Sequence, residues 1–305
     1  MIVILAGGTG SIKLVRGFSS IVDDVVIISN VADNFWYYDL YICPDIDTVI
    51  YGLSKTLDRE RGWGIQNDTF NFLNRFKEIG GSSWFHIGDQ DLAIHIIRTF
   101  MLHNKKSLSE VTDYLTKKFS IKNKILPISD DHYETRFVTK THKDLHIQEF
   151  WVQYKGLLDI SNIYYKNINN VHTNPKALSA LDDAEMIIIA PGNPISSIGP
   201  MVTLTDFNIK LSEHKHKVFA ISPLIGSNAI SGPAVRYLQN NNIDISPFGI
   251  AKFYSNFIAH LVISNTDSKY AQKIRNLGIN TIETNIIMNN LVDEINLARK
   301  LLNKK

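Results

Sequence analysis

The sequence predicts an α/β protein built on a parallel β-sheet, and the spacing of its apolar runs carries that prediction. A short apolar run at residues 2–5 leads through a glycine-rich turn into a helical pattern, and a second apolar run follows at 25–29. Further apolar runs of strand length lie late in the chain, at 186–190, 218–221 and 261–264. Strand, crossover helix and strand form the parallel α/β unit, so we expect a Rossmann-like core.

The middle of the chain follows other patterns. From about 56 to 119 the apolar residues recur with helical spacing, and residues 107–110 have the sequence of a capping box. Residues 135–139 and 145–152 are rich in β-formers and flank a short polar turn, which predicts a β-hairpin.

These patterns together predict a single domain made of a core and an insertion. The Rossmann-like core comprises about residues 1–54 and 171–305. A largely helical insertion, at about 55–170, also carries the hairpin.

Composition and charge exclude several classes of partner. Apolar residues make up 44% and charged residues 20% of the 305 residues, as in ordinary globular proteins, and the net charge of +2 is no footprint for nucleic acid or an anionic membrane. Cys43 is the single cysteine, which excludes an intrachain disulfide. No apolar run approaches the roughly 20 residues that span a bilayer. We therefore expect a cytoplasmic protein.

A glycine-rich turn is the first candidate binding element. It consists of Gly7, Gly8, Thr9, Gly10 and Ser11 and opens a helix directly after a strand. Backbone N–H groups and the positive helix end favour a phosphate there, whereas a tight turn without a ligand is the alternative.

The spacing of this turn distinguishes it from two common nucleotide sites. No Gly-Lys-Ser/Thr follows, as a P-loop requires, and the second strand ends in Ser29 and Asn30 without the acid that holds a ribose hydroxyl. A nicotinamide oxidoreductase is therefore disfavoured. Lys13 lies within reach of a bound phosphate, although a lone lysine is more often solvated.

A second loop, residues 191–200, also follows a buried strand. Prolines and glycines fix its backbone, and Asn193, Ser196, Ser197 and Gly199 contribute donors or close approach. A rigid connector without a ligand is the alternative. Two such loops in one sheet predict a ligand with more than one polar group, such as a nucleoside diphosphate.

Aspartates recur at loop positions, notably Asp33, Asp45, Asp47 and Asp89. Carboxylates near phosphates suit Mg²⁺. Helix capping explains each aspartate taken alone, and Asp89 is a good example. As a set, they predict at least one metal or catalytic role.

Segments in a fixed order over nearly the whole chain resemble the 2-phospho-L-lactate transferase (CofD) family of deazaflavin coenzyme F-420 biosynthesis. They are residues 7–11 (GGTGS), 43–51 (CPDIDTVIY), 61–65 (RGWGI), 67–70 (NDTF), 88–95 (GDQDLAIH), 125–131 (ILPISDD), 145–152 (LHIQEFWV), 193–200 (NPISSIGP), 221–223 (ISP) and 231–234 (SGPA).

The resemblance implies a transferase. A guanosine-diphosphate donor carrying phospholactate or phosphoenolpyruvate meets the deazaflavin alcohol FO, whose terminal ribityl hydroxyl attacks the phosphorus, and GMP leaves. Mg²⁺ is the implied cofactor, and a homodimer is the implied assembly.

The resemblance also assigns roles to residues. The loop at 7–11 with Lys13, and the loop at 193–199, hold the guanosine and diphosphate of the donor. Asp47 falls where the family binds the deazaflavin, so it orients or deprotonates the attacking hydroxyl, or holds the metal together with Asp45. His86 and Asp89 are the further implied deazaflavin contacts.

Departures from the family's pattern occur at two positions. Asn34 stands where relatives carry an acid, and Gly192 stands where relatives carry a serine. The competing hypothesis is a non-catalytic sugar-nucleotide-binding regulator of the YvcK type, which shares the Gly-Gly-Thr-Gly start. The middle of the chain, with its RGWGI and GDQDLAIH segments, favours the transferase.

Overall fold

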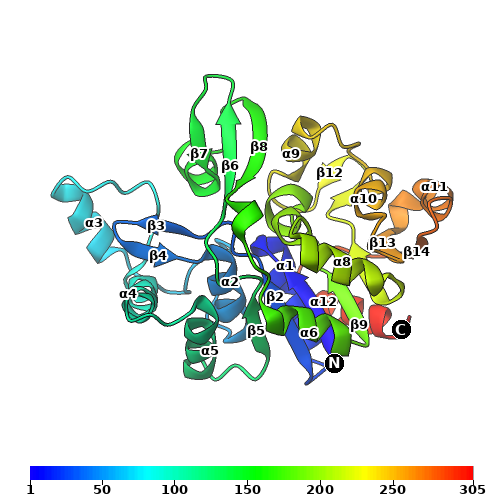
Figure 1. The fold of residues 1–305 in the computed structure, drawn as a ribbon, viewed down its shortest axis with the longest axis horizontal. Coiled ribbons are helices and arrows are strands. Elements are labelled where there is room, and N and C mark those ends of the chain that lie inside the picture. The colour runs from blue at the N-terminus through cyan, green and yellow to red at the C-terminus, as the bar shows by residue number, and fades with distance from the viewer. Residues whose placement is uncertain (305) are drawn as a thin grey trace.

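The computed structural model describes residues 1–304 and has a seven-stranded parallel sheet at its centre, which confirms the predicted α/β class (Figure 1). Every neighbouring pair of its strands runs parallel. In sheet order the strands are β14 (Asn280–Thr284), β13 (His260–Ser264), β10 (Val218–Ile221), β9 (Met186–Ile189), β1 (Ile2–Ala6), β2 (Val25–Ser29) and β5 (Lys124–Pro127).

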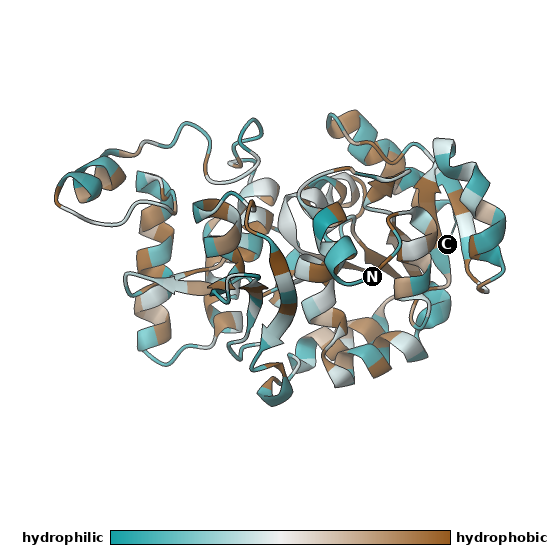
Figure 2. Ribbon diagram, turned by 90° about the horizontal axis from the view of Figure 1, so that it is seen from above, coloured by the Kyte–Doolittle hydropathy of each residue, from teal (hydrophilic) through white to brown (hydrophobic). Residues whose placement is uncertain are grey.

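Helices pack around this sheet and supply the crossovers between its parallel strands. Figure 2 shows apolar stretches along the central strands and polar residues on the outer helices, because the strands are buried on both faces. The helices are α1 (Gly8–Ser19), α2 (Pro44–Leu53), α3 (Asn71–Glu78), α4 (Asp89–His103), α5 (Leu108–Lys118), α6 (Pro175–Asp183), α7 (Gly199–Val202), α8 (Thr205–Glu213), α9 (Ala234–Asn240), α10 (Pro247–Tyr254), α11 (Ala271–Arg275) and α12 (Leu291–Leu302).

One strand of the central sheet, β5, lies inside the range 55–170 that was predicted to be an insertion. β5 pairs with β2, and its apolar run of two residues, Ile125 and Leu126, is too short to be recognised as a strand. The helices α3, α4 and α5 therefore precede the edge strand β5 in the sequence, whereas the hairpin follows it. The predicted capping box at α5 is confirmed, since the Ser107 and Glu110 side chains each accept a hydrogen bond from the other residue's backbone.

The predicted hairpin forms, but its second strand is shorter than expected. β6 (Glu134–Thr139) pairs antiparallel with β7 (Asp144–His146) and with β8 (Ile160–Lys166). The prediction of strand up to residue 152 is wrong: Glu149 accepts a hydrogen bond from the His146 N–H at 2.7 Å, and the chain turns into a π-helical segment, Glu149–Gln153.

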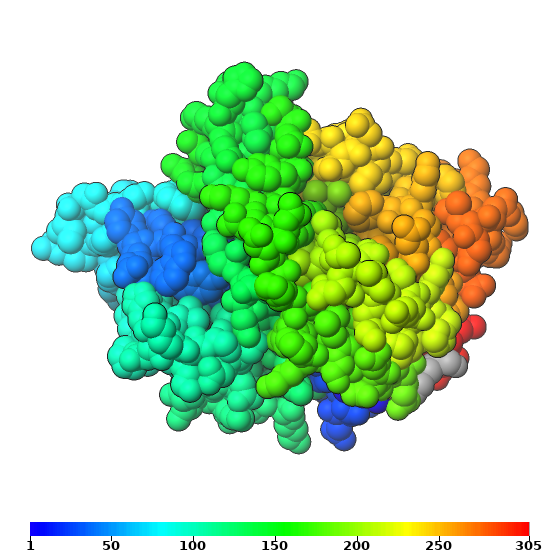
Figure 3. Space-filling model, in the orientation of Figure 1, coloured from blue at the N-terminus to red at the C-terminus, as the bar shows by residue number. Residues whose placement is uncertain are grey.

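Two parts of the chain project from the body around the sheet. The three-stranded hairpin sheet rises on one side, and the α3 segment extends at one end, beside the short ribbon of β3 (Phe35–Tyr37) and β4 (Leu40–Ile42) (Figure 3). The remaining short elements are β11 (Leu224–Ile225), β12 (Asn228–Ala229), a π-helical segment (Pro194–Ile198) and 3₁₀ turns (Ile168–Asn170, Lys215–Lys217, Asn265–Tyr270). No helix within residues 1–304 has the length and apolar character needed to span a bilayer.

Candidate active site

A cavity of about 590 Å³ opens where the loops after β1 and β9 meet. Its wall consists of backbone-rich loops, two carboxylates and several aromatic side chains, which come from distant parts of the sequence. Parallel α/β sheets bind ligands at this edge, beyond the carboxyl ends of their strands.

The first loop joins β1 to α1 and presents the start of that helix to the cavity. Gly7 is the N-cap in an extended conformation, and Gly8, Thr9 and Gly10 of the first turn line the cavity. First-turn amides have no intrahelical partner, so they are free for an anion unless a side chain takes them. Asp45 takes one, accepting from the Gly8 N–H at 2.7 Å.

The second loop packs directly against the first. A Cβ on Gly7 would lie 2.8 Å from the Ser197 Cβ, and one on Gly10 would lie 2.7 Å from the Pro191 carbonyl oxygen. Gly192 is equally constrained, because its Cβ would lie 2.7 Å from the Gly7 carbonyl oxygen. The departure at Gly192 thus fits a closer approach of the two backbones.

Asn193 begins the π-helical turn of the second loop. Its Oδ1 accepts from the Ile195 N–H at 2.9 Å and from the Ser196 N–H at 3.2 Å. Ser196 and Ser197 line the cavity together with Asn193. Gly199 does not line it, since it packs against the Tyr165 ring and hydroxyl.

Asp33 and Asp45 form a buried carboxylate pair on the cavity wall. Asn30 Nδ2 donates to both, at 3.1 Å to Asp33 Oδ1 and 2.8 Å to Asp45 Oδ2. Within residues 1–304, neither carboxylate takes part in an ion pair. Burial raises the pKa of Asp45 to about 6, and burial together with the Asp45 charge raises the pKa of Asp33 well above its usual range.

This pair offers oxygen ligands of the kind that hard divalent cations take. The pKa values of both carboxylates are raised, and neither has a cationic side chain as partner within the described part of the chain. A hard divalent cation bound between them would stabilise their charged forms. Asp33 is one of the loop aspartates noted in the sequence, but nothing in the sequence spacing predicts that it lies beside Asp45. Asn34 points elsewhere: it is fully buried and outside the cavity wall, so its departure removes no ligand from this pair.

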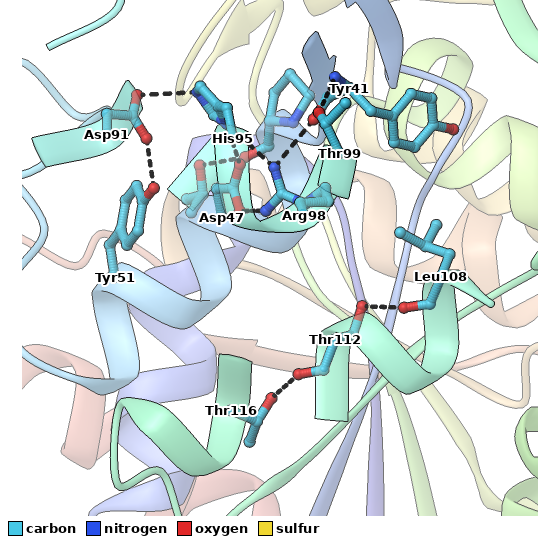
Figure 4. Close-up of polar contacts among 12 residues, drawn as sticks. Tyr41, Asp47, Tyr51, Asp91, His95, Arg98, Thr99, Leu108, Thr112 and Thr116 are labelled. Atoms are coloured by element: carbon cyan, nitrogen blue, oxygen red, sulfur yellow. Dashed lines mark hydrogen bonds and ion pairs between the residues drawn. The ribbon is translucent and has the colours of Figure 1, made fainter. Parts of the chain in front are cut away.

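Asp47 lies on the opposite face of α2 from Asp45, because two residues turn a helix by about 200°. Its carboxylate forms a buried ion pair with Arg98 of α4, in close contact, and it does not line the cavity (Figure 4). The expectation that Asp45 and Asp47 share one metal or acceptor site therefore does not match the structure, which separates them.

Asp47 belongs instead to a buried polar network. His95 Nε2 lies 3.4 Å from Asp91 Oδ2, and Tyr51 donates its hydroxyl to Asp91 (Figure 4). Asp47, Asp91 and His95 are close enough to share a cation. Burial disfavours the charged form of Arg98, but the Asp47 carboxylate raises the pKa of Arg98 above its usual value. The guanidinium is therefore charged, and it balances the negative charge of Asp47 without a metal ion.

Asp89 acts as a helix cap, and the helix that it caps is α3. Its carboxylate accepts from the backbone N–H of Phe72 at 2.9 Å and of Asn71 at 3.1 Å, and it lies outside the cavity wall. The Asp68 carboxylate in turn caps α4, because it accepts a hydrogen bond from the first-turn N–H of Gln90 at 2.8 Å. The capping alternative therefore explains Asp89, and nothing places it against a deazaflavin.

Aromatic side chains line the cavity together with His86. They are Trp63, Phe85 and Trp151. The Trp63 and His86 rings lie 6.3 Å apart between centroids, and the Arg61 guanidinium lies 5.1 Å from the centroid of the Trp63 ring. Trp151 belongs to the π-helical segment after β7, so both π-helical turns within residues 1–304 contribute to this cavity. Such turns occur frequently at functional sites.

Ser11 and Lys13 do not face the main cavity. Ser11 is buried, and its hydroxyl donates to the Gly7 carbonyl oxygen at 2.6 Å, which stabilises the turn. Lys13 Nζ donates to the Met288 carbonyl oxygen at 2.9 Å and lines a neighbouring cavity of about 340 Å³, which touches the same helix start through Thr9 and Gly10.

Comparison with known proteins gives one consistent family. The family described as "2-phospho-L-lactate transferase CofD" matches residues 2–295. The 2-phospho-L-lactate transferase of Methanocaldococcus jannaschii is 34% identical over 99% of this chain and 97% of its own length. That of Methanococcoides burtonii is 35% identical over 98% of each chain.

A solved structure supports the fold alone. Protein BH3568 from Bacillus halodurans superimposes with a TM-score of 0.67 over 99% of this chain and 98% of its own, at 16% identity. At that identity the likeness concerns the arrangement of strands and helices and not the activity.

Proposed function

This chain belongs to the 2-phospho-L-lactate transferase CofD family, and from that premise we propose that its cavity joins a nucleotide-linked donor to a deazaflavin alcohol. The donor carries a phospholactyl or phosphoenolpyruvyl group on guanosine diphosphate, and the acceptor is FO. The ribityl hydroxyl oxygen forms a bond to the phosphorus bearing the three-carbon acid. The bond from that phosphorus to the bridging oxygen breaks, and GMP leaves with the electron pair.

The observation that supports this proposal is that one cavity combines two chemically different kinds of lining group. Helix-start amides and the polar loop of Asn193, Ser196 and Ser197 suit a diphosphate. The side chains of Trp63 and Trp151 suit a planar ring system. The Asp33–Asp45 pair lines the same cavity.

Asp33 and Asp45 are the residues that would hold Mg²⁺. The ion would neutralise charge that develops on the phosphoryl oxygens as the bond to GMP breaks. Asn30 and the Gly8 N–H keep the two carboxylates oriented toward one another through the contacts described above. Phosphoryl transfer needs little covalent help from a protein, so this positioning supplies most of the catalysis.

A homodimer is supported by the unusual amphipathicity of α4. This helix buries polar side chains, including Asp91, His95 and Arg98, and exposes Ile96 and Phe100. Ordinary surface helices have the reverse pattern, so the exposed apolar face of α4 is suited to a second copy of the chain.

Transfer assays with both donors test the proposal directly. The protein would be mixed with FO, Mg²⁺ and the lactyl or enolpyruvyl donor, with GMP release and the mass of the deazaflavin product as readouts. We expect metal-dependent product with one donor preferred. Tight binding of a sugar nucleotide without any turnover would instead favour the regulatory protein.

A further inference from the structure

The Tyr237 hydroxyl is a buried polar group of the cavity that the transfer chemistry above does not use. Tyr237 lies on α9, its side chain is 1% exposed, and it lines the cavity near the Asn193 loop. Its ring packs against the Phe137 ring at 4.9 Å and the Phe150 ring at 6.3 Å between centroids. The ring is therefore fixed, yet its hydroxyl has no hydrogen-bond partner within residues 1–304.

Asn193 supplies a second unpartnered donor to the same cavity. Its Oδ1 is used by the backbone N–H groups of the π-helical turn, whereas its Nδ2 is buried and has no partner within the described chain. Because buried polar groups are nearly always hydrogen-bonded in native proteins, two such donors in one ligand cavity indicate a missing acceptor. An anionic oxygen would offset the cost of burying these donors best, because hydrogen bonds to charged acceptors are the strongest.

The protonation state of Tyr237 agrees with a role as donor. Burial, and after it the charge of Asp33, raises the pKa of the Tyr237 hydroxyl far above its usual value. The hydroxyl therefore keeps its proton at any physiological pH. Tyr237 lines the same cavity as Asp33 and Asp45, where the transferred phosphoryl group is expected.

We propose that Tyr237 contacts the substrate and determines specificity, donating its hydroxyl hydrogen bond to an anionic oxygen of the transferred group, with Asn193 Nδ2 as the second donor. This inference rests on the proposed function. The oxygen belongs either to the carboxylate of the three-carbon acid or to the phosphoryl group, and both present the same chemistry to these donors.

Tyr237→Phe is the decisive variant, because it removes the hydroxyl and keeps the ring that packs on Phe137 and Phe150. We expect kcat/KM for the donor to fall about 10- to 100-fold, the range for losing a hydrogen bond to a charged group. The melting temperature should stay equal or rise, because the variant no longer buries an unpaired hydroxyl. A structural role would lower both together.

Tyr254→Phe is the matched control, since Tyr254 is also buried at 1% exposure but lies on α10 outside the cavity wall. It should leave donor kinetics unchanged. Asn193→Asp keeps the oxygen that caps the turn and replaces the unpartnered N–H donor by a carboxylate oxygen. It should therefore lower kcat/KM for the donor substrate at least as much as Tyr237→Phe does. Unchanged donor kinetics in Tyr237→Phe would overturn the proposal.

A donor analogue distinguishes the two sources of the oxygen. The P²-ethyl ester of guanosine diphosphate has the same phosphates and lacks the carboxylate. If Tyr237 binds the carboxylate, the penalty of Tyr237→Phe disappears with this analogue. If it binds a phosphoryl oxygen, the penalty persists. No penalty with either donor refutes both.

Ligand-induced stabilisation separates this inference from the proposed function. If the wild-type protein transfers nothing to FO, the proposed function fails, and the shift in melting temperature caused by Mg²⁺ and the donor still tests the contact. A smaller shift in Tyr237→Phe than in the wild type supports it. An equal shift, or no shift in the wild type, overturns it.

Discussion

The Asp47–Arg98 ion pair can be broken from either side, and the two single substitutions together with the double substitution form a thermodynamic cycle. The side chains are 6% and 1% exposed, so either charge left alone is buried without a counter-ion. Arg98→Met should lower the free energy of unfolding by about 3–5 kcal/mol, because the Asp47 carboxylate loses its cation. Asp47→Leu should cost a similar amount for the stranded guanidinium.

The double variant Asp47→Leu with Arg98→Met should recover most of that loss. Replacing a buried ion pair by apolar side chains is often neutral or stabilising, so we expect a free energy of unfolding within about 2 kcal/mol of the wild type. The coupling energy from the cycle should then exceed about 2 kcal/mol. The measurement is urea unfolding followed by tryptophan fluorescence, with the slope against denaturant compared among variants.

The exposed Arg75–Glu78 pair of α3 is the matched control. Its side chains are 73% and 64% exposed, so the same cycle there should give a coupling below about 1 kcal/mol. A loss below about 1 kcal/mol for Arg98→Met would refute the assignment of a buried charge pair. It would then restore Asp47 as a candidate for a direct role in the cavity.

Three further outcomes follow from the site and its surroundings. The apo protein should lose stability as pH rises from about 4 to about 6, because the pKa of Asp45 is about 6 in the folded state and returns to its ordinary value of 3.8 in the unfolded chain. This loss should amount to about 3 kcal/mol in the free energy of unfolding, measured by denaturant unfolding at a series of pH values, and Asp45→Asn should remove it. A wild-type free energy of unfolding that does not change over this pH range would contradict the raised pKa. Gly10→Ala should weaken donor binding at least tenfold in calorimetry, since its Cβ would press on the Pro191 carbonyl 2.7 Å away; unchanged affinity would place the donor elsewhere. Phe100→Glu should convert a dimer to a monomer in light scattering without loss of helix content, and an unchanged mass would exclude the α4 face as the interface.

Local patterns determined five of the seven core strands, the glycine turn and the capping box. Buried parallel strands are mainly apolar, as residues 25–28 are, and the turn after β1 requires glycines because a second loop approaches its backbone closely. The edge strands β5 and β14 were not predicted: β5 has a very short apolar run, and β14 has polar residues at most positions. A capping box is complete within four residues, so residues 107–110 specify it without tertiary help. Both loops that the sequence proposed for a phosphate do line one cavity.

The roles of individual aspartates were decided only by the tertiary structure. Asp45 and Asp47 look equivalent in the sequence, but the helix places one toward Asn30 and Gly8 and the other toward Arg98. Asp89 has the spacing of an N-cap for its own helix, yet it caps α3.

The sequence by itself therefore determined the five inner strands of the sheet and two loops that line its cavity, because hydrophobic period and turn chemistry act over a few neighbouring residues. Only the tertiary structure decided which side chains come together there: Asp33 and Asp45 share the Asn30 amide, and Tyr237 and Asn193 line one cavity. The partners of a buried polar group are set by how helices and strands pack across long stretches of sequence, and no local spacing contains that information.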